Sequence, residues 1–189
     1  MKGKISVQKL CAAALLTALG IVIPMFMPVK VVIPPASFTL ASHVPILIAM
    51  MISPVVAVTV ALGTTVGFLF GGFPIVIVLR AATHLVFALL GSLYLRKNHT
   101  ILLTGLRVRI FSFLIGIVHA FCEVLVVAVF YFGGQMATSY YQSGFLQSVL
   151  LLVGLGTVVH SMVDFEIALA VAKVLFKQKG FSFLNSAQK

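Results

Sequence analysis

Three pairs of ionisable residues stand four positions apart within apolar parts of the sequence: Arg80 and His84, His119 and Glu123, and His160 and Asp164. Residues at this spacing share one face of a helix. An arginine on such a face can bind a carboxylate through two parallel hydrogen bonds. A histidine beside a carboxylate can hold or transfer a proton. The pairs therefore indicate binding of a solute anion, acid–base chemistry, or ion pairs between helices.

The rest of the chain is strongly apolar, with 61% hydrophobic and 8% charged residues and a mean hydropathy of +1.22 over 189 residues. Soluble domains carry about 25% charged residues, so the composition predicts an integral membrane protein. A helix that crosses a membrane needs about 20 mostly apolar residues. We expect an all-α fold with six transmembrane helices, at about 6–27, 40–52, 54–71, 74–95, 108–132 and 146–176. They form a single domain over 1–177, and residues 178–189 form a polar cytoplasmic tail.

The second apolar segment is short for a complete crossing, so we expect it to be tilted or to begin within the preceding loop. Positive charge sets the orientation of the predicted helices. The net charge is +10, and most of the basic residues lie before the first span, between the fourth and fifth, and at or beyond the end of the sixth. Basic flanks stay in the cytoplasm, which places both termini inside and explains the charge without nucleic acid.

Two basic residues, Lys30 and Arg80, do not follow this distribution. Arg80 lies about two turns into the fourth span, counted from its outer end, where a charge costs about 2.5–3.5 kcal/mol and must face the bundle interior. One interpretation is a buried ion pair with Glu123, and the other is a contact with an anionic group of a solute. By depth, we expect Arg80, His84 and Glu123 to share the outer half, and His160 and Asp164 to lie near the middle or in the inner half.

The sequence carries no signature of a metal site or a cofactor. The histidines come from scattered helices without close acidic or thiol companions, so we interpret them as hydrogen-bonded interior residues and expect no metal. No GxxxxGK[ST], GxSxG or HExxH motif is present, which argues against ATP binding and hydrolysis by those motifs. Two other classes stay open: a membrane-embedded enzyme using His119–Glu123 or His160–Asp164, and a structural subunit without a solute site.

Two segments between spans and one face of the first helix also attract attention. The apolar segment 28–39 contains three prolines and is expected to fold back over a pocket as a lid. The segment 133–145 offers the aromatic side chains of Tyr140 and Tyr141. Ala14 and Ala18 form a pair of small residues on one helix face, which favours close packing within this bundle or docking of another membrane protein.

The chain resembles the substrate-binding S components of energy-coupling factor (ECF) vitamin transporters. Ala14-Leu-Leu-Thr-Ala18 is similar to the AxxxA docking motif of that family. Three further stretches resemble the niacin-specific S components: Ile23-Pro-Met-Phe-Met-Pro-Val-Lys30, Pro34-Pro-Ala-Ser-Phe-Thr-Leu-Ala-Ser-His43-Val-Pro, and Phe73-Pro-Ile-Val-Ile-Val-Leu-Arg80-Ala.

The resemblance implies a non-enzymatic subunit of a bacterial cell membrane importer without a cofactor of its own. Such a subunit captures a vitamin from outside and docks through its first helix, here through Ala14 and Ala18, on a transmembrane T component driven by two cytosolic ABC ATPases. For nicotinate, Arg80 would hold the carboxylate, and His43 or His84 would bind the ring nitrogen or the carboxylate. The remaining expected site residues are Phe38 or Tyr140 and Tyr141 against the ring, with Glu123 and Lys30 nearby. Pantothenate is the alternative carboxylate vitamin.

Overall fold

The computed structural model describes residues 6–33, 36–136 and 138–177. Helices dominate it: α1 Val7–Phe26, α2 Val44–Ile52, α3 Pro54–Phe70, α4 Ile75–Lys97, α5 Gly105–Phe132 and α7 Gly156–Leu175. Shorter elements are the 3₁₀ helix η1 His99–Leu103, the one-turn helix α6 Thr138–Gln142 and the π-helix η2 Leu146–Leu155. The predicted tail over 178–189 and two of the three prolines of the predicted lid, Pro34 and Pro35, lie outside the described residues.

Within the described part of the chain, four helices are long and apolar enough to cross a membrane. They are Val7–Phe26, Ile75–Lys97, Gly105–Phe132 and the continuous Leu146–Leu175, and Pro54–Phe70 is a shorter apolar helix. Large apolar side chains such as Phe70 (85% exposed) and Phe132 (75% exposed) cover their outward faces. A soluble surface does not tolerate this much contiguous apolar area, so the prediction of a largely helical membrane protein is confirmed, while the number of crossings stays a prediction.

The second predicted span is instead a short central helix. Helix α2 has nine residues, and all nine are buried. At about 1.5 Å per residue it covers roughly half of the ~30 Å hydrocarbon layer, so α2 by itself does not span a membrane. It packs against α1, α3, α4 and α7. At Ser53 the chain turns directly into α3, where the Ser53 hydroxyl accepts a hydrogen bond from the Val56 amide at 3.3 Å.

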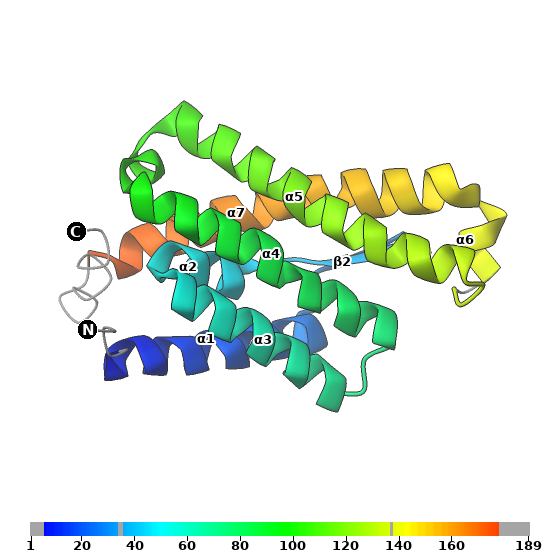
Figure 1. Ribbon diagram of the computed structural model, residues 1–189, viewed down its shortest axis with the longest axis horizontal. Coiled ribbons are helices and arrows are strands. Elements are labelled where there is room, and N and C mark those ends of the chain that lie inside the picture. The colour runs from blue at the N-terminus through cyan, green and yellow to red at the C-terminus, as the bar shows by residue number, and fades with distance from the viewer. Residues whose placement is uncertain (1–5, 34–35, 137, 178–189) are drawn as a thin grey trace.

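The predicted lid segment forms a β-hairpin, which is a departure from the expected all-α fold. Strands β1 Lys30–Ile33 and β2 Ala36–Thr39 pair antiparallel, with Lys30 opposite Thr39 and Val31 opposite Phe38. The β-branched run from Val31 to Ile33 favours this extended conformation over helix. In Figure 1, β2 lies along the length of the bundle rather than beyond one of its ends. Phe38 of β2 packs against Gly156 at the start of α7, so the hairpin lies against that helix.

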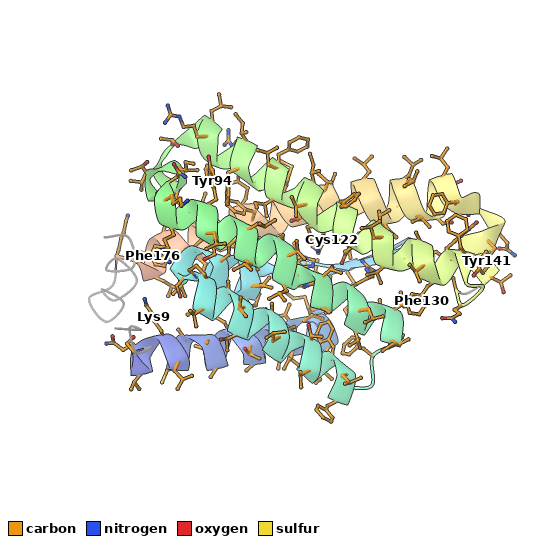
Figure 2. All side chains as sticks on the ribbon, in the orientation of Figure 1. Lys9, Tyr94, Cys122, Phe130, Tyr141 and Phe176 are labelled. Atoms are coloured by element: carbon orange, nitrogen blue, oxygen red, sulfur yellow. The ribbon has the colours of Figure 1, made fainter. Side chains whose placement is uncertain are left out.

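The ends of the helices gather at two opposite ends of the molecule. The start of α1, the η1 connection and the end of α7 lie at one end, and the α3–α4 turn and α6 lie at the other (Figure 1). Among the labelled side chains, Lys9 and Phe176 lie toward the first end, Tyr141 lies at the second, and Cys122 lies between them (Figure 2). The basic residues that flank α1, η1 and α7 thus lie at the same end.

Helices α1 and α3 approach closely through small residues. A Cβ atom on Gly63 would lie 2.6 Å from Cγ2 of Thr17, and one on Gly20 would lie 2.8 Å from Oγ1 of Thr64. Ala14 and Ala18 lie on another face of α1 and are exposed. This pair therefore does not pack within the described bundle, which removes one of its two predicted roles.

Candidate functional site

A cavity of about 280 Å³ lies among α1, the hairpin and helices α2, α3, α4, α5 and α7. This volume is at the lower limit of the ~300–1,000 Å³ that is usual for small-molecule sites. Six of the predicted substrate-binding residues line it: Lys30, Phe38, His43, Arg80, His84 and Glu123. Residues from seven elements, far apart in sequence, thus meet around one cavity.

Arg80 and Glu123 form an ion pair on the cavity wall. Nη2 of Arg80 donates to Oε2 of Glu123 at 2.9 Å, and the two side chains are 17% and 4% exposed. The Thr157 hydroxyl donates to the same oxygen at 2.8 Å. Nε of Arg80 is buried and has no hydrogen-bond partner among the described residues. The predicted ion pair is therefore present, and it leaves part of the guanidinium unused.

Four histidines lie together beside this ion pair. The ring of His43, the residue just before α2, lies 4.9 Å from that of His84, 4.7 Å from that of His119 and 5.0 Å from that of His160. His84 comes from α4, His119 from α5 and His160 from α7. The expectation of scattered histidines without acidic companions is wrong. Residues far apart along the chain meet where these helices cross, and spacing along a single sequence does not reveal such crossings.

Glu123 also faces two of these histidines through its second oxygen. Oε1 lies 3.6 Å from Nε2 of His84 and 3.5 Å from Nε2 of His119, whose side chain is fully buried. These distances exceed those of ordinary hydrogen bonds, and both nitrogens lack a hydrogen-bond partner in the described part of the chain. The side chains of His84, His119 and Glu123 therefore converge without satisfying one another.

Asp164 holds the turn between the hairpin and α2. It accepts hydrogen bonds from the backbone amides of Ala41 at 2.8 Å and His43 at 2.9 Å, and it lies 3.1 Å from Nδ1 of His43. Ala41 has a φ of 65°, a left-handed conformation that costs a non-glycine residue roughly 1–2 kcal/mol. Asp164 is thus a structural contact that attaches this turn to α7.

His160 and Asp164 lie beside His43, which also belongs to the group around Glu123, and their depth in the membrane stays a prediction. His160 contacts His43 through its ring and lies 3.1 Å from the Ser42 hydroxyl through Nε2. Because the turn before α2 enters the bundle beside α7, it links Asp164 and His160 to the group around Glu123. A depth counted along single helices does not include this turn, so it did not reveal the link.

Aromatic side chains form the apolar part of the cavity wall. The Phe68 and Phe73 rings stack with centroids 4.5 Å apart, and Phe38 lies 5.5 Å from the ring of His160. Phe38 packs directly on Gly156, where an added Cβ would come within 2.5 Å of its ring. A flat ligand would therefore meet rings on the cavity wall, although Phe68 and Phe73 were not among the predicted site residues.

The two predicted tyrosines do not line the cavity. Tyr141 lies at the end of the bundle (Figure 2), where its hydroxyl accepts from the Met136 amide and donates to the Tyr131 carbonyl, both at 3.1 Å. Burial raises the pKa of Tyr140, and the charge of Arg80 acts on that pKa in the opposite direction. Tyr140 is thus electrostatically coupled to Arg80 from outside the cavity wall.

Thr157, His119 and His160 are further polar residues of this region that the predicted site omitted. Thr157, His160 and Asp164 stand at i, i+3 and i+7, so they share one face of α7. His119 stands four residues before Glu123 on α5. This shared spacing was the available signal in the sequence, but it did not show that the faces of α4, α5 and α7 point at one another.

The sequence was also compared with known proteins. It is 47% identical over 185 residues to the niacin transporter NiaX of Lactococcus lactis subsp. cremoris. The alignment covers 98% of this chain and 82% of the relative. No family model matches the chain. No solved structure matches it either.

Proposed function

We propose a function from the premise that this chain belongs to the family of the niacin transporter NiaX. The resemblance to niacin-specific S components drawn from the sequence motifs agrees with this relative. The chain is a transport protein and not an enzyme, and we assign niacin as its substrate. The observation that carries the proposal is the half-buried Arg80, with its Nε buried and unpartnered among the described residues, on the wall of a small, partly aromatic cavity.

Arg80 would hold the carboxylate of nicotinate. Its Nε is buried without a partner among the described residues, and an arginine that already pairs with Glu123 is fixed in position before a ligand arrives. A carboxylate supplies the acceptor that this donor lacks, and charge-assisted hydrogen bonds are the strong ones. The unused donor of Arg80 thus supports an anionic ligand rather than a purely structural ion pair.

The remainder of the cavity suits the aromatic ring of the same ligand. Phe38, Phe68 and Phe73 offer flat apolar surfaces, and His43 and His84 offer ring nitrogens on the polar side. The pyridine nitrogen of nicotinate needs one such hydrogen-bonding partner. Pantothenate is longer, more flexible and non-aromatic, so this small cavity with its aromatic walls favours nicotinate over that alternative.

The proposed topology has six crossings, with the hairpin and α2 together providing the second. Since the start of α1, η1 and the end of α7 lie at one end of the bundle (Figure 1), an even number of crossings separates them. Lys9, Arg96, Lys97 and Lys177 are basic residues near these points. We propose that this end faces the cytoplasm, so that the ligand enters from the α6 end.

The proposed partners are a transmembrane T component and two cytosolic ABC ATPases. Ala14 and Ala18 are exposed on α1, and Leu15 beside them is 63% exposed. A flat face of small residues permits close approach of a partner helix within the membrane. This arrangement supports docking through α1, while the cavity on the other side of α1 stays available to the ligand.

Binding of nicotinate to the purified chain in detergent, measured by calorimetry, tests the substrate assignment. We expect micromolar or tighter binding, and we expect Arg80→Ala to weaken it more than tenfold, or by at least about 1.4 kcal/mol. Arg109→Ala is the matched control, because it removes an arginine that is 70% exposed and far along α5 from Glu123. Unchanged affinity in Arg80→Ala, or wild-type binding of pantothenate but not of nicotinate, would contradict the assignment.

Uptake by cells that express the whole transporter tests the docking face. We expect Ala18→Phe to abolish nicotinate uptake and to leave binding to the purified chain intact. Leu125→Phe is the control, since Leu125 is 51% exposed on α5 and also faces outward. If uptake survives in Ala18→Phe, the partner docks elsewhere.

A further inference from the structure

The convergence of His43, His84, His119 and Glu123 has the composition of a metal site. One ligand atom from each of these four residues lies within 4.8 Å of the others. Two of those atoms, Nε2 of His84 and Nε2 of His119, are buried without a hydrogen-bond partner among the described residues. Burying a polar atom without a partner costs about 1–3 kcal/mol. Two such nitrogens directed toward the same point therefore indicate that a ligand binds there.

We propose that these four side chains bind one divalent transition-metal ion, with Zn²⁺ as the best match to the donor set. Three imidazoles and one carboxylate are typical ligands of tetrahedral zinc, with bonds of about 2.0–2.2 Å. Bonds of that length place the ligand atoms of a tetrahedron roughly 3.3–3.6 Å apart. Oε1 of Glu123 already lies at 3.6 Å from Nε2 of His84 and at 3.5 Å from Nε2 of His119.

Groups behind the four ligands orient them for this role. Nδ1 of His43 lies 3.1 Å from Asp164, which leaves Nε2 of His43 for the ion. With Nε2 of His43 and of His84 on the ion, Nδ1 of His84 is the nitrogen of these two residues that stays available to nicotinate. Nδ1 of His119 lies 3.4 Å from the Ser161 hydroxyl. A carboxylate or hydroxyl on the far nitrogen of a histidine is the usual arrangement around metal ligands, because it fixes the ring and the tautomer.

Glu123 is oriented in the same way. Its Oε2 accepts hydrogen bonds from Arg80 and Thr157, so Oε1 is the atom left for the ion. The carboxylate would then bridge Arg80 and the metal, as in a ligand whose second oxygen is held by the protein.

The neighbouring group of His43, His160 and Asp164 also has three potential ligand atoms close together. Its atoms, however, are engaged in hydrogen bonds. Asp164 accepts from two backbone amides and lies within hydrogen-bond distance of His43, and Nε2 of His160 lies 3.1 Å from the Ser42 hydroxyl. The orphaned nitrogens lie in the first group, so the metal is assigned there.

The charge of this ion would also affect the binding of nicotinate in the cavity, an inference that rests on the proposed function. Arg80 and Lys30 on the cavity wall contribute two positive charges, and Glu123 and Asp164 contribute two negative charges, so neutral imidazoles leave the region without net charge. A divalent ion makes the same region net positive, which attracts the carboxylate of nicotinate. Ion and nicotinate then favour one another's binding reciprocally.

Titration of the full-length chain in detergent with Co²⁺, after removal of metals by a chelator, tests the site. Co²⁺ adopts tetrahedral Zn²⁺ sites and reports their geometry through visible absorption, and elemental mass spectrometry gives the stoichiometry. We expect one ion per chain with a tetrahedral spectrum. We expect His119→Gln to weaken binding more than tenfold and His160→Gln, the matched control, to keep it.

His119 is the informative position because it does not line the cavity, so its replacement does not remove a wall contact. Circular dichroism checks that His119→Gln is folded, and His84→Gln serves as the second variant if it is not. Absence of a bound ion in the wild-type chain overturns the proposal. Binding of the ion by both His119→Gln and His84→Gln as tightly as by the wild type also overturns it. Loss of binding in His160→Gln alone overturns it as well, because that result would place the ion at the neighbouring group.

The last arm separates the metal site from the proposed function. Nicotinate affinity is measured with and without Zn²⁺, and we expect the ion to strengthen it more than tenfold in the wild-type chain but not in His119→Gln. Equal affinity in both conditions overturns the coupling and leaves the niacin assignment standing. Ion binding without any nicotinate binding contradicts the proposed function and leaves the metal site standing.

Discussion

Helix α5 takes part in two arginine–glutamate ion pairs that differ in burial and in distance. Within its second half, Glu123 accepts from Arg80 of α4 at 2.9 Å, and the side chains are 17% and 4% exposed. Near its start, Arg109 lies 3.7 Å from Glu166 of α7, and the side chains are 70% and 53% exposed. Both pairs join α5 to another helix, so the comparison isolates the effect of burial.

The difference teaches which charges this chain retains for a purpose. An exposed pair contributes about 0–1 kcal/mol because solvent screens it. A buried pair must offset the loss of hydration of both charges, so it is weak evidence for stability, yet removing one partner is costly. The Arg80–Glu123 pair is therefore better explained by a role in the cavity than by stabilisation of the bundle, whereas Arg109 and Glu166 need no functional explanation.

The largest expected effect comes from breaking the buried pair. Glu123→Ala should lower the free energy of unfolding by about 3–5 kcal/mol, because it leaves the Arg80 charge uncompensated. Thermal unfolding of the purified chain in detergent, followed by circular dichroism, measures it. Glu166→Ala is the matched control and should stay close to the wild type. Equal losses in the two variants would erase the distinction between the pairs.

A smaller effect is expected from Thr157→Val, which keeps both charges and removes one buried donor to Glu123. A hydrogen bond to a charged group contributes about 1.5–3 kcal/mol, so the loss in stability should fall below that of Glu123→Ala in the same assay. Thr59→Val is a control, since the Thr59 hydroxyl donates to a backbone carbonyl on an exposed helix face. A Thr157→Val chain as stable as the wild type would mean that Arg80 alone holds the carboxylate.

The smallest effect is expected at the exposed pair. Arg109→Ala should change stability by no more than about 1 kcal/mol. Because solvent-exposed charges are screened within about 10 Å at 0.1 M salt, raising the salt concentration should remove any difference from the wild type. A large loss of stability that does not change with salt would mean that Arg109 is shielded from solvent, contrary to its 70% exposure in the structure.

Part of the candidate site was accessible from sequence because membrane energetics restrict it. A charge within an apolar helix is costly, so Arg80, His84 and Glu123 were recognised as candidates, and i,i+4 spacing paired Arg80 with His84 and Glu123 with His119. Lys30 stood out in the distribution of basic residues, Phe38 and His43 came from the resemblance to a family, and all three line the cavity. Tyr140 and Tyr141 do not line it, since a turn of aromatic residues can point its side chains in several directions.

Phe68 and Phe73 illustrate why the rest of the site escaped prediction. Each lies in an apolar segment where a phenylalanine carries no signal, and their stacking depends on the turn between α3 and α4. Helix α2 escaped prediction for the same reason, because its nine buried residues were interpreted from the sequence as part of a transmembrane span. A fully apolar run is compatible with burial in lipid or in protein, and only the surrounding elements distinguish the two.

The sequence by itself determined that this chain belongs in a membrane and which few side chains carry charge within its apolar segments. Those properties depend on the composition of local segments and on the cost of transferring each into lipid. Tertiary structure alone decided that four histidines, Glu123 and Asp164 lie together, because their proximity depends on how α4, α5 and α7 cross and on the turn between the hairpin and α2. Contacts between helices are set by packing of whole faces, and no local spacing encodes them.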